Sequence, residues 1–506
     1  MASRSTIPGS QSEHRGLIYW MERVLKELEN VRKAPDPDAV HDLRVSIRRC
    51  RAVAAVMEEV DPDPTWPEMR KLGRKLFRQL GDLRDTHVLE DWSKKLGAEA
   101  DPIRQQLLAL FKERENELRE GALRVAAKFD EKAWKRLEHG LQRRARMVPP
   151  EGLAAECLAL ERLQAAKKLD SQALRSEKPE PWHALRIGVK RFRYTVECLL
   201  PQRYEVWGEN LKRVQDLLGD VHDLDVLAQT MSEVAAAESE EARTTWTERI
   251  ASERHERLET YRQLTLGKTS LWHEWRQGLP HGERLEAAAL ARLRVTARAL
   301  EGNTRRTAQV ARLAMRLYDT FARVHAGTAF DDKDLQKVMQ AAARLHGVGA
   351  SLKPKSPQKA ARDFLRGMAL PPGWTDTEWE LLSNVVRYHC GGQPKVKHKA
   401  FARLSAEQKN VVCALAGVLR LARELRKCGI DSAVGLRVEK SVDALILQVP
   451  GLEDTEAVAA RLAAGKHLLE SSLERPLIVK PVQRTAKVME LPKLKEFSET
   501  NAAVSA

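Results

Sequence analysis

The sequence predicts a mainly all-α fold of antiparallel helix bundles, with a small α+β appendage near its carboxyl end. Three observations support this prediction. Long charged segments rich in Leu and Ala fill residues 102–146 and 153–174. Proline pairs separate such segments, as at Pro149-Pro150. A basic motif within one expected helix also recurs in a second one. At 506 residues, the chain is long enough for two or more domains with separate cores.

Taken in order, the chain begins with a polar tail over residues 1–14. A helix is expected next, up to about Arg32, because apolar residues recur there at helical spacing. Pro35 and Pro37 end it, and a second helix follows as far as the Asp-Pro repeat at residues 61–64. Such short breaks between long helices indicate antiparallel neighbours.

The second helix contains the motif that recurs. VHDLRVSIRRCR at residues 40–51 returns as WHALRIGVKRFR at residues 182–193. In each copy a histidine is followed by cations three, seven, eight and ten positions later. These residues are His41, Arg44, Arg48, Arg49 and Arg51 in the first copy and His183, Arg186, Lys190, Arg191 and Arg193 in the second. Offsets of three, seven and ten share one helix face, so each copy carries a cationic stripe.

A cationic stripe has an ordinary explanation, because a run of charges is often a solvated helix face. Two copies with one spacing favour a shared ligand instead, since solvation requires no particular register. Arginine stays charged and offers planar bidentate donors, so stripes of this spacing suit a ligand with repeated phosphates. Pro37 and Pro181 mark helix starts, which would bring His41 and His183 near a first turn, where an anion is favoured.

With the patterns HxLRVxxRRxR and HxLRxxxKRxRY, residues 15–265 resemble the CHAD domain, the conserved histidine α-helical domain. The resemblance implies two pseudo-symmetric four-helix bundles and binding of inorganic polyphosphate. We expect the two stripes to line facing surfaces and to pair with successive phosphoryl oxygens. The helices after the motifs also echo each other, with Asp85 equivalent to Asp223 and Arg84 to His222. They supply further candidate cations, which are Arg74, Lys75, Arg78, Lys212 and Arg213.

The charge balance supports a polyanionic partner. The chain has 86 basic and 71 acidic residues and a net charge of +15. This charge alone does not separate polyphosphate from nucleic acid or an acidic membrane, so nucleic acid is kept as the less favoured alternative. Aromatic residues are scarce at 5%, so no stacking platform for single strands is evident.

The six cysteines are dispersed without a CxxC pair and indicate reduced thiols. The amino-terminal segment has no apolar signal region, and no uncharged apolar run approaches 18 residues. We therefore expect a cytoplasmic protein that neither spans nor inserts into a membrane. Polyphosphate granules are one candidate location, and a homodimer is left open.

The second half of the chain has its own pattern. Glycines and mixed polarity predict a linker over residues 266–288. Residues 289–482, with the phrases LQKVMQAAARLHGVG and VRYH, then resemble the HD-type C-terminal domain of the exopolyphosphatase and guanosine pentaphosphatase family. A strand pair and a helix are expected after Arg437, and residues 483–506 form a polar tail.

The departures from the HD pattern bear on function. Thr307 stands where the first metal-binding histidine would be, and Gly347 replaces the aspartate that would follow His346. His346 and His389 remain, and two ligands do not make a metal site. We therefore expect no cofactor, metal or catalytic residue.

The sequence thus predicts a non-enzymatic protein that binds inorganic polyphosphate, with a binding or scaffolding role at granules. Two alternatives stay open. One is a hydrolase acting on polyphosphate or a guanosine polyphosphate through the HD-like domain, and the other is a nucleic-acid-binding protein.

Overall fold

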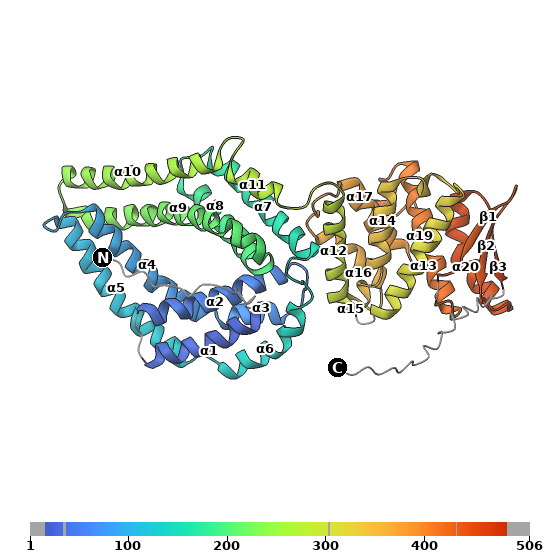
Figure 1. Ribbon diagram of the computed structural model, residues 1–506, viewed down its shortest axis with the longest axis horizontal. Helices are drawn as coiled ribbons and strands as arrows, with labels where there is room; N and C mark the ends of the chain where they lie inside the picture. The colour runs from blue at the N-terminus through green and yellow to red at the C-terminus, as the bar shows by residue number, and fades with distance from the viewer. Residues whose placement is uncertain (1–15, 34–36, 302–303, 432, 483–506) are drawn as a thin grey trace, which may run out of the picture. The chain divides into compact units, whose positions relative to one another are not determined.

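The computed structural model describes residues 16–33, 37–301, 304–431 and 433–482. The described chain is mainly α-helical, as the sequence predicts (Figure 1). The polar tails expected at residues 1–14 and 483–506 lie outside the described residues. The chain divides into two compact units, Met1–Thr307 with Gln340–Arg387 and Ala308–Met339 with Tyr388–Ala506. Within the described ranges, no helix combines the length and the apolar character needed to cross a membrane.

The first bundle is built from the amino-terminal helices. They are α1 (Leu17–Lys33), α2 (Pro37–Met57), α3 (Thr65–Leu72), α4 (Arg74–Leu96), α5 (Pro102–Ala127) and α6 (Glu131–Ala145). Helix α1 packs against α2 and α5, α4 packs against α2 and α5, and these four form the bundle. The short helix α3 and helix α6 pack beside them, with α6 against α1 and α3.

The second bundle repeats this plan. Its helices are α7 (Leu153–Ala173), α8 (Pro179–Leu199), α9 (Pro201–Val234) and α10 (Glu240–Thr265). They pack in sequence, α7 on α8, α8 on α9, and α9 on α10 (Figure 1). The two helices that carry the repeated motif, α2 and α8, both have 21 residues. The prediction of two related four-helix bundles is confirmed.

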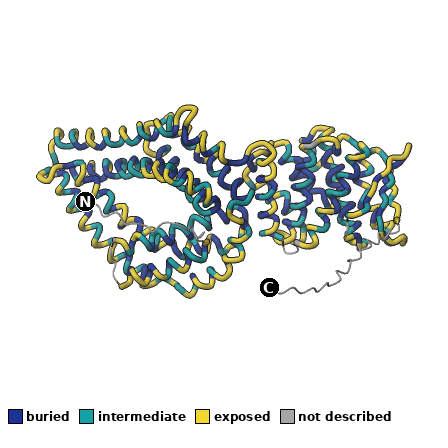
Figure 2. The backbone as a smooth tube through the Cα atoms, viewed as in Figure 1, coloured by how far each residue is buried: buried dark blue, intermediate teal, exposed yellow. Residues whose placement is uncertain are grey.

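The apolar spacing of the motif decides which side of each helix is buried (Figure 2). In α2 the fully buried residues include Leu43, Ile47, Cys50 and Ala54, and in α8 they include Leu185, Val189, Phe192 and Val196. Steps of three and four residues keep such side chains on one helix face. The cations at the intervening positions are consequently left on the half-buried and exposed sides.

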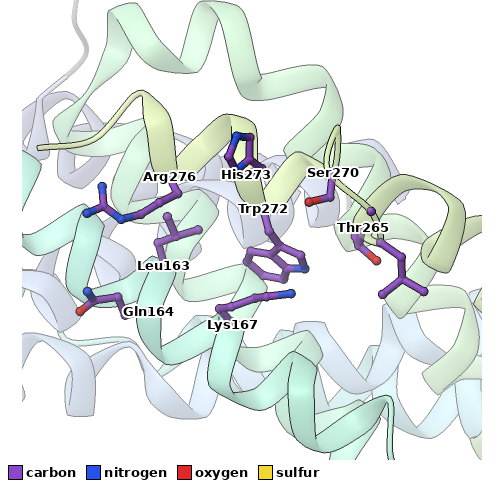
Figure 3. A pocket seen from close by; sticks show the side chains of 10 residues that line it. Leu163, Gln164, Lys167, Thr265, Ser270, Trp272, His273 and Arg276 are labelled. Atoms are coloured by element: carbon purple, nitrogen blue, oxygen red, sulfur yellow. The ribbon is translucent and has the colours of Figure 1, made fainter. Parts of the chain in front are cut away.

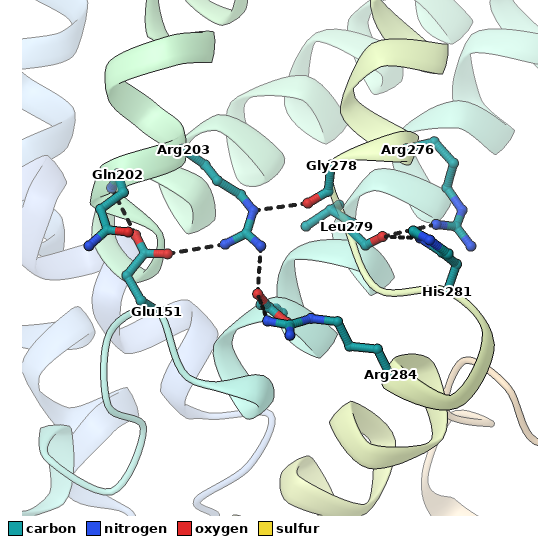
Figure 4. A network of polar contacts seen from close by, with 9 residues as sticks. Glu151, Gln202, Arg203, Arg276, Gly278, Leu279, His281 and Arg284 are labelled. Atoms are coloured by element: carbon teal, nitrogen blue, oxygen red, sulfur yellow. Dashed lines mark hydrogen bonds and ion pairs between the residues drawn. The ribbon is translucent and has the colours of Figure 1, made fainter.

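Residues 266–288, predicted as a linker, contain helix α11 (Leu271–Gln277) and the start of α12 (Gly282–Leu300). Trp272 and Trp275 of α11 are buried in the core of the bundles, and α12 packs against α7. The buried carboxylate of Glu156 on α7 accepts hydrogen bonds from Arg203 of α9 at 2.5 Å and Arg284 of α12 at 2.8 Å (Figure 4). These contacts attach the segment to the second bundle.

Further helices and a small sheet complete the chain. The helices are α13 (Thr304–Arg323), α14 (Lys333–Leu345), α15 (Gly349–Leu352), α16 (Pro357–Gly367), α17 (Asp376–Tyr388), α18 (Lys399–Ala402) and α19 (Ala406–Lys427). The sheet contains β1 (Arg437–Lys440), β2 (Leu445–Pro450) and β3 (Leu477–Val482), and α20 (Glu456–Leu473) connects β2 to β3. Strand β2 pairs antiparallel with β1 and parallel with β3, and α20 packs against α19. The predicted α+β appendage is confirmed.

Candidate functional site

The two helices with the cationic stripes pack against each other. Arg49 of α2 forms an ion pair with Glu197 of α8, whose side chain is only 6% exposed. The guanidinium carbon of Arg48 lies 5.5 Å from the centre of the Tyr194 ring, also on α8. The structure therefore brings the two copies of the motif side by side, one from each bundle.

Four cations of the two stripes form a cluster, which we call the cationic cluster: Arg44 and Arg48 of α2 with Arg186 and Lys190 of α8. Burial and the charges of Arg186, Arg44 and Arg48 lower the pKa of Lys190 to about 8. Burial and the charges of Arg48 and Arg84 also lower the pKa of Arg44, against the opposing effect of Asp85. Like charges disfavour each other at short range, so a bound anion would relieve this arrangement.

Two equivalent carboxylates lie beside the cationic cluster. Asp85 of α4 pairs with Arg44 at 3.6 Å. Asp223 of α9 occupies the matching position in the second bundle, and burial together with Asp85 and Asp220 raises its pKa to about 6. Arg186 and Lys190 oppose this rise. The carboxylates thus offset only part of the positive charge of the cluster.

The cationic cluster also has unused hydrogen-bonding capacity. The Nε atoms of Arg44, Arg48 and Arg186 are buried, and within the described part of the chain they have no hydrogen-bond partner. Buried polar groups are nearly always paired in folded proteins, because an unmade hydrogen bond is costly. The Nε atoms of Arg49 and Arg193 are likewise buried without a partner there, so this feature extends along both stripes.

Other residues of the stripes are held by the protein itself. Three of them have intramolecular partners: Arg49 with Glu197, Arg51 with the Arg70 carbonyl oxygen at 2.8 Å, and Arg193 with the Tyr204 hydroxyl at 3.1 Å. Arg191 is exposed and forms no ion pair within the described ranges. The stripe residues therefore differ in what they contact, although their spacing is the same in both copies.

The two histidines of the motif differ as well. The Nδ1 atom of His183 lies 3.2 Å from Nδ1 of His222 on α9. Burial and the charge of Arg186 lower the pKa of His183, and they lower that of His222 to about 4. His41 is exposed and lies 3.4 Å from the Asp42 carboxylate. A bound polyanion would favour protonation of the His183 pair.

The cations of the adjoining helices are exposed. They are Arg74, Lys75 and Arg78 on α4 and Lys212 and Arg213 on α9. Arg74 lies near enough to Arg51 to influence it electrostatically: the pKa of Arg51 is lowered mainly by burial and also by the charges of Arg70 and Arg74. These five side chains are accessible from solvent, and their part in binding stays a prediction.

A pocket of about 320 Å³ opens beside the first stripe. His41 and Arg44 of α2 line it, and four further residues come from two other helices: Arg84 and His87 of α4 with Glu115 and Arg119 of α5. None of these four is among the candidate site residues predicted from the sequence, and Glu115 and Arg119 lie outside its repeated segments. We call this space the α4–α5 pocket.

A second pocket, of about 510 Å³, lies between α7 and α11 (Figure 3). Trp272 and Leu163 give it an apolar wall. Its cations are already engaged, since Lys167 pairs with Asp170 at 2.7 Å and Arg276 donates to the Pro280 carbonyl oxygen at 3.1 Å. This pocket is consequently less suited to a polyanion than the cationic cluster.

Thr307 and Gly347, the residues at the expected positions of HD ligands, lie close to each other. A Cβ atom added to Gly347 would lie 2.8 Å from Oγ1 of Thr307 and 2.9 Å from Oε1 of Glu301. Burial raises the pKa of Glu301 to about 7, and a hydrogen bond with Thr307 opposes this rise. His346 is buried, with its Nδ1 atom 2.9 Å from the Ala343 carbonyl oxygen. Over the described residues, no three His, Cys, Asp or Glu side chains are grouped to hold a metal.

Comparisons with known proteins agree with both resemblances inferred from the motifs. The family model of the CHAD domain matches residues 21–232, and that of Ppx/GppA phosphatase, domain III, matches residues 293–464. A solved structure of the CHAD domain from the plant Ricinus communis is 22% identical, with a TM-score of 0.36. The match covers 52% of this chain and 88% of that one. No curated protein matches the chain.

Proposed function

Since the chain contains a CHAD domain followed by a Ppx/GppA domain III, we propose that it binds inorganic polyphosphate at the cationic cluster. The convergence of Arg44, Arg48, Arg186 and Lys190 carries this proposal. Two packed helices contribute two cations each, and burial together with the charges of Arg186, Arg44 and Arg48 lowers the pKa of Lys190, which supports a deficit of negative charge at this place. A ligand with closely spaced negative charges supplies the missing counter-charge.

The chemistry of polyphosphate matches that of the cationic cluster. Each interior phosphate of the polymer offers charged oxygens and no base, ring or donor. Guanidinium groups bind such oxygens through short charge-assisted hydrogen bonds. Several guanidinium donors of the stripes, Nε of Arg44, Arg48 and Arg186 among them, have no partner in the described part of the chain. Affinity then comes from repeated contacts along the polymer and falls as salt rises.

The aromatic rings near the stripes favour polyphosphate over single-stranded nucleic acid. Single-strand binding proteins stack bases on accessible aromatic rings. Here guanidinium groups already lie over these rings, with Arg48 over Tyr194, Arg49 over Trp20 at 5.0 Å, and Arg51 over Phe77 at 4.9 Å. The rings are therefore occupied by cation–π contacts within the protein.

Competition between polymers tests this proposal. Labelled long-chain polyphosphate is bound to the full-length protein and then displaced by unlabelled polyphosphate, single-stranded DNA or duplex DNA at equal phosphate concentration. We expect polyphosphate to displace the label at the lowest concentration. Equal displacement by DNA would instead assign the cationic cluster to polyanions in general.

Hydrolysis of polyphosphate or a guanosine polyphosphate is the second candidate, because residues 293–464 match a domain of Ppx/GppA phosphatases. Phosphate release with Mg²⁺ or Mn²⁺ that disappears in a His346→Ala variant would establish it. The juxtaposition of Thr307 and Gly347, where the resemblance places a histidine and an aspartate, favours binding over hydrolysis.

A further inference from the structure

The α4–α5 pocket gathers arginines from three helices around one small space. Arg44 comes from α2, Arg84 from α4 and Arg119 from α5. Arg84 and Arg119 are exposed, and within the described ranges neither forms an ion pair. The charge of Arg84 also contributes to the lowered pKa of Arg44, after burial and Arg48. The three arginines therefore line one small space, and of the three only Arg44 has an ion-pair partner within the described ranges, Asp85 at 3.6 Å.

Neither acidic residue of the lining forms an ion pair with Arg84 or Arg119 within the described ranges. Glu115 lies 3.3 Å from Nε2 of His87 and 3.4 Å from Nζ of Lys112. These two contacts lower the pKa of Glu115 despite its partial burial. Asp38, at the start of α2, is the other carboxylate of the lining. Because Glu115 is already engaged by His87 and Lys112, the guanidinium groups of Arg84 and Arg119 remain available for an added anion.

The size and charge of the pocket suit a compact, highly charged group. A volume of about 320 Å³ is at the small end of ligand pockets. The terminal phosphoryl group of a linear polyphosphate has one more ionisable oxygen than an interior group. Its second ionisation resembles that of a phosphate monoester, with a pKa of about 6, so it is largely doubly charged at neutral pH. With its extra negative charge, the terminal group should therefore bind more tightly than an interior phosphate to the arginines that line the pocket.

The second bundle lacks the same arrangement at the equivalent positions. Arg84 is replaced there by His222. His87 is replaced by Asp225, which pairs with Arg254 of α10 at 2.7 Å. The stripe is therefore present in both bundles, whereas Arg84 and His87 of the α4–α5 pocket are present only in the first. Arg44 belongs both to the pocket and to the cationic cluster, so a polymer held at its end in the pocket continues directly onto the cluster.

On the premise that the protein binds polyphosphate, we propose that the α4–α5 pocket binds the terminal phosphoryl group of a linear polyphosphate chain. Arg84 and Arg119 are the residues specific to the chain end. Arg44 links the bound end to the cationic cluster, which holds the interior phosphates. The protein then distinguishes polyphosphate with free ends from cyclic or end-capped polyphosphate of equal charge.

The test compares linear tripolyphosphate with cyclic tetrametaphosphate, which has similar charge and no end. Binding of both to the full-length protein is measured by calorimetry, for wild type and for an Arg84→Ala/Arg119→Ala variant. We expect wild type to prefer the linear ligand by about tenfold, as charge-assisted hydrogen bonds of this kind imply, and the variant to bind both alike. Both replaced side chains are exposed, and thermal melting verifies that the variant is folded.

A matched control removes the same charge elsewhere. Lys135→Ala/Arg136→Ala deletes two exposed cations of α6 that belong to neither the stripes nor the pocket, and this variant should keep the preference for the linear ligand. Loss of the preference in the control, or its absence in wild type, would overturn the proposal. Long-chain polyphosphate is measured in parallel. If wild type fails to bind the long chain, the proposed function itself is wrong; if it binds the long chain without preferring ends, only the end site is wrong.

Discussion

The carboxylate of Asp223 should weaken polyphosphate binding at neutral pH, and its replacement by Asn should strengthen it. Asp223 faces Arg186 and Lys190 of α8, Asp85 of α4 and Asp220 of its own helix. Burial and the two neighbouring carboxylates raise its pKa to about 6. At pH 7.5 it is therefore ionised, and it competes with the ligand for the cations of the cluster.

The expected magnitude follows from Coulomb's law. A charge ~8 Å from a bound phosphate contributes about 0.5–2 kcal/mol at effective dielectric constants between 20 and 80. Asp223→Asn should thus tighten binding of long-chain polyphosphate by about 2–30-fold at neutral pH. In wild type the same gain should develop as pH falls through about 6, because protonation removes the charge. The variant should lack this part of the pH dependence.

Loss of the Asp223 charge should also increase the free energy of unfolding of the ligand-free protein. A carboxyl group with a raised pKa binds its proton more tightly in the folded state than in the unfolded state. The wild type therefore gains stability as pH falls through about 6 toward the unfolded pKa of 3.8. At pH 7.5 this gain is absent, so Asp223→Asn should increase the free energy of unfolding by about 1–3 kcal/mol.

Calorimetry and urea unfolding at about pH 5 and pH 7.5 measure both effects. Asp216→Asn is the matched control, because Asp216 is an exposed carboxylate of the same helix. Weaker binding by Asp223→Asn at pH 7.5, or a pH profile parallel to wild type, would refute the assignment of Asp223 to the cationic cluster.

Three further changes address the structural roles of single residues. Glu156→Gln removes the buried counter-charge of two arginines, and urea unfolding should show a loss of about 2–4 kcal/mol. Arg49→Ala breaks the ion pair with α8 and should lower the free energy of unfolding by about 1–3 kcal/mol. Arg191→Ala, which removes an exposed side chain, should change it by no more than about 0.5 kcal/mol. Equal losses in the two variants would contradict the different roles assigned to these arginines. Gly347→Asp introduces a Cβ atom 2.8 Å from Oγ1 of Thr307, so we expect a lower melting temperature. We also expect no phosphate release by this variant with Mg²⁺. A gain of hydrolysis would contradict this expectation.

The resemblance carried by the repeated motif predicts the two related bundles, and the spacing of the motif predicts which side of each helix is buried. The buried steps from Leu43 to Ala54 and from Leu185 to Val196 follow directly from that spacing. The packing of α2 against α8 was an expectation from symmetry, and the contact between Arg49 and Glu197 shows it directly. The sequence could not separate Arg49 from Arg48, since their partners lie about 150 positions away in the chain.

Two features escaped the sequence analysis for a common physical reason. The α4–α5 pocket joins residues of three helices, and Arg119 belongs to no pattern that marks it as part of a site. Helix α11 has only seven residues, which is too short for a periodic signal, and glycines flank it. Its Trp272 and Trp275 are buried by tertiary packing that local composition does not reveal.

Binding of long-chain polyphosphate at two salt concentrations tests the role of the cationic cluster most directly. The comparison is between wild type and the variant Arg44→Ala/Arg48→Ala/Arg186→Ala/Lys190→Ala, with circular dichroism to verify its fold. Each phosphate contact contributes about 0.7 to the slope of log affinity against log salt, so loss of four contacts should reduce this slope by about three. We expect tight, salt-sensitive binding by wild type and loss of this binding in the folded variant. Equal affinities and equal slopes would instead show that the stripe is a solvated helix face.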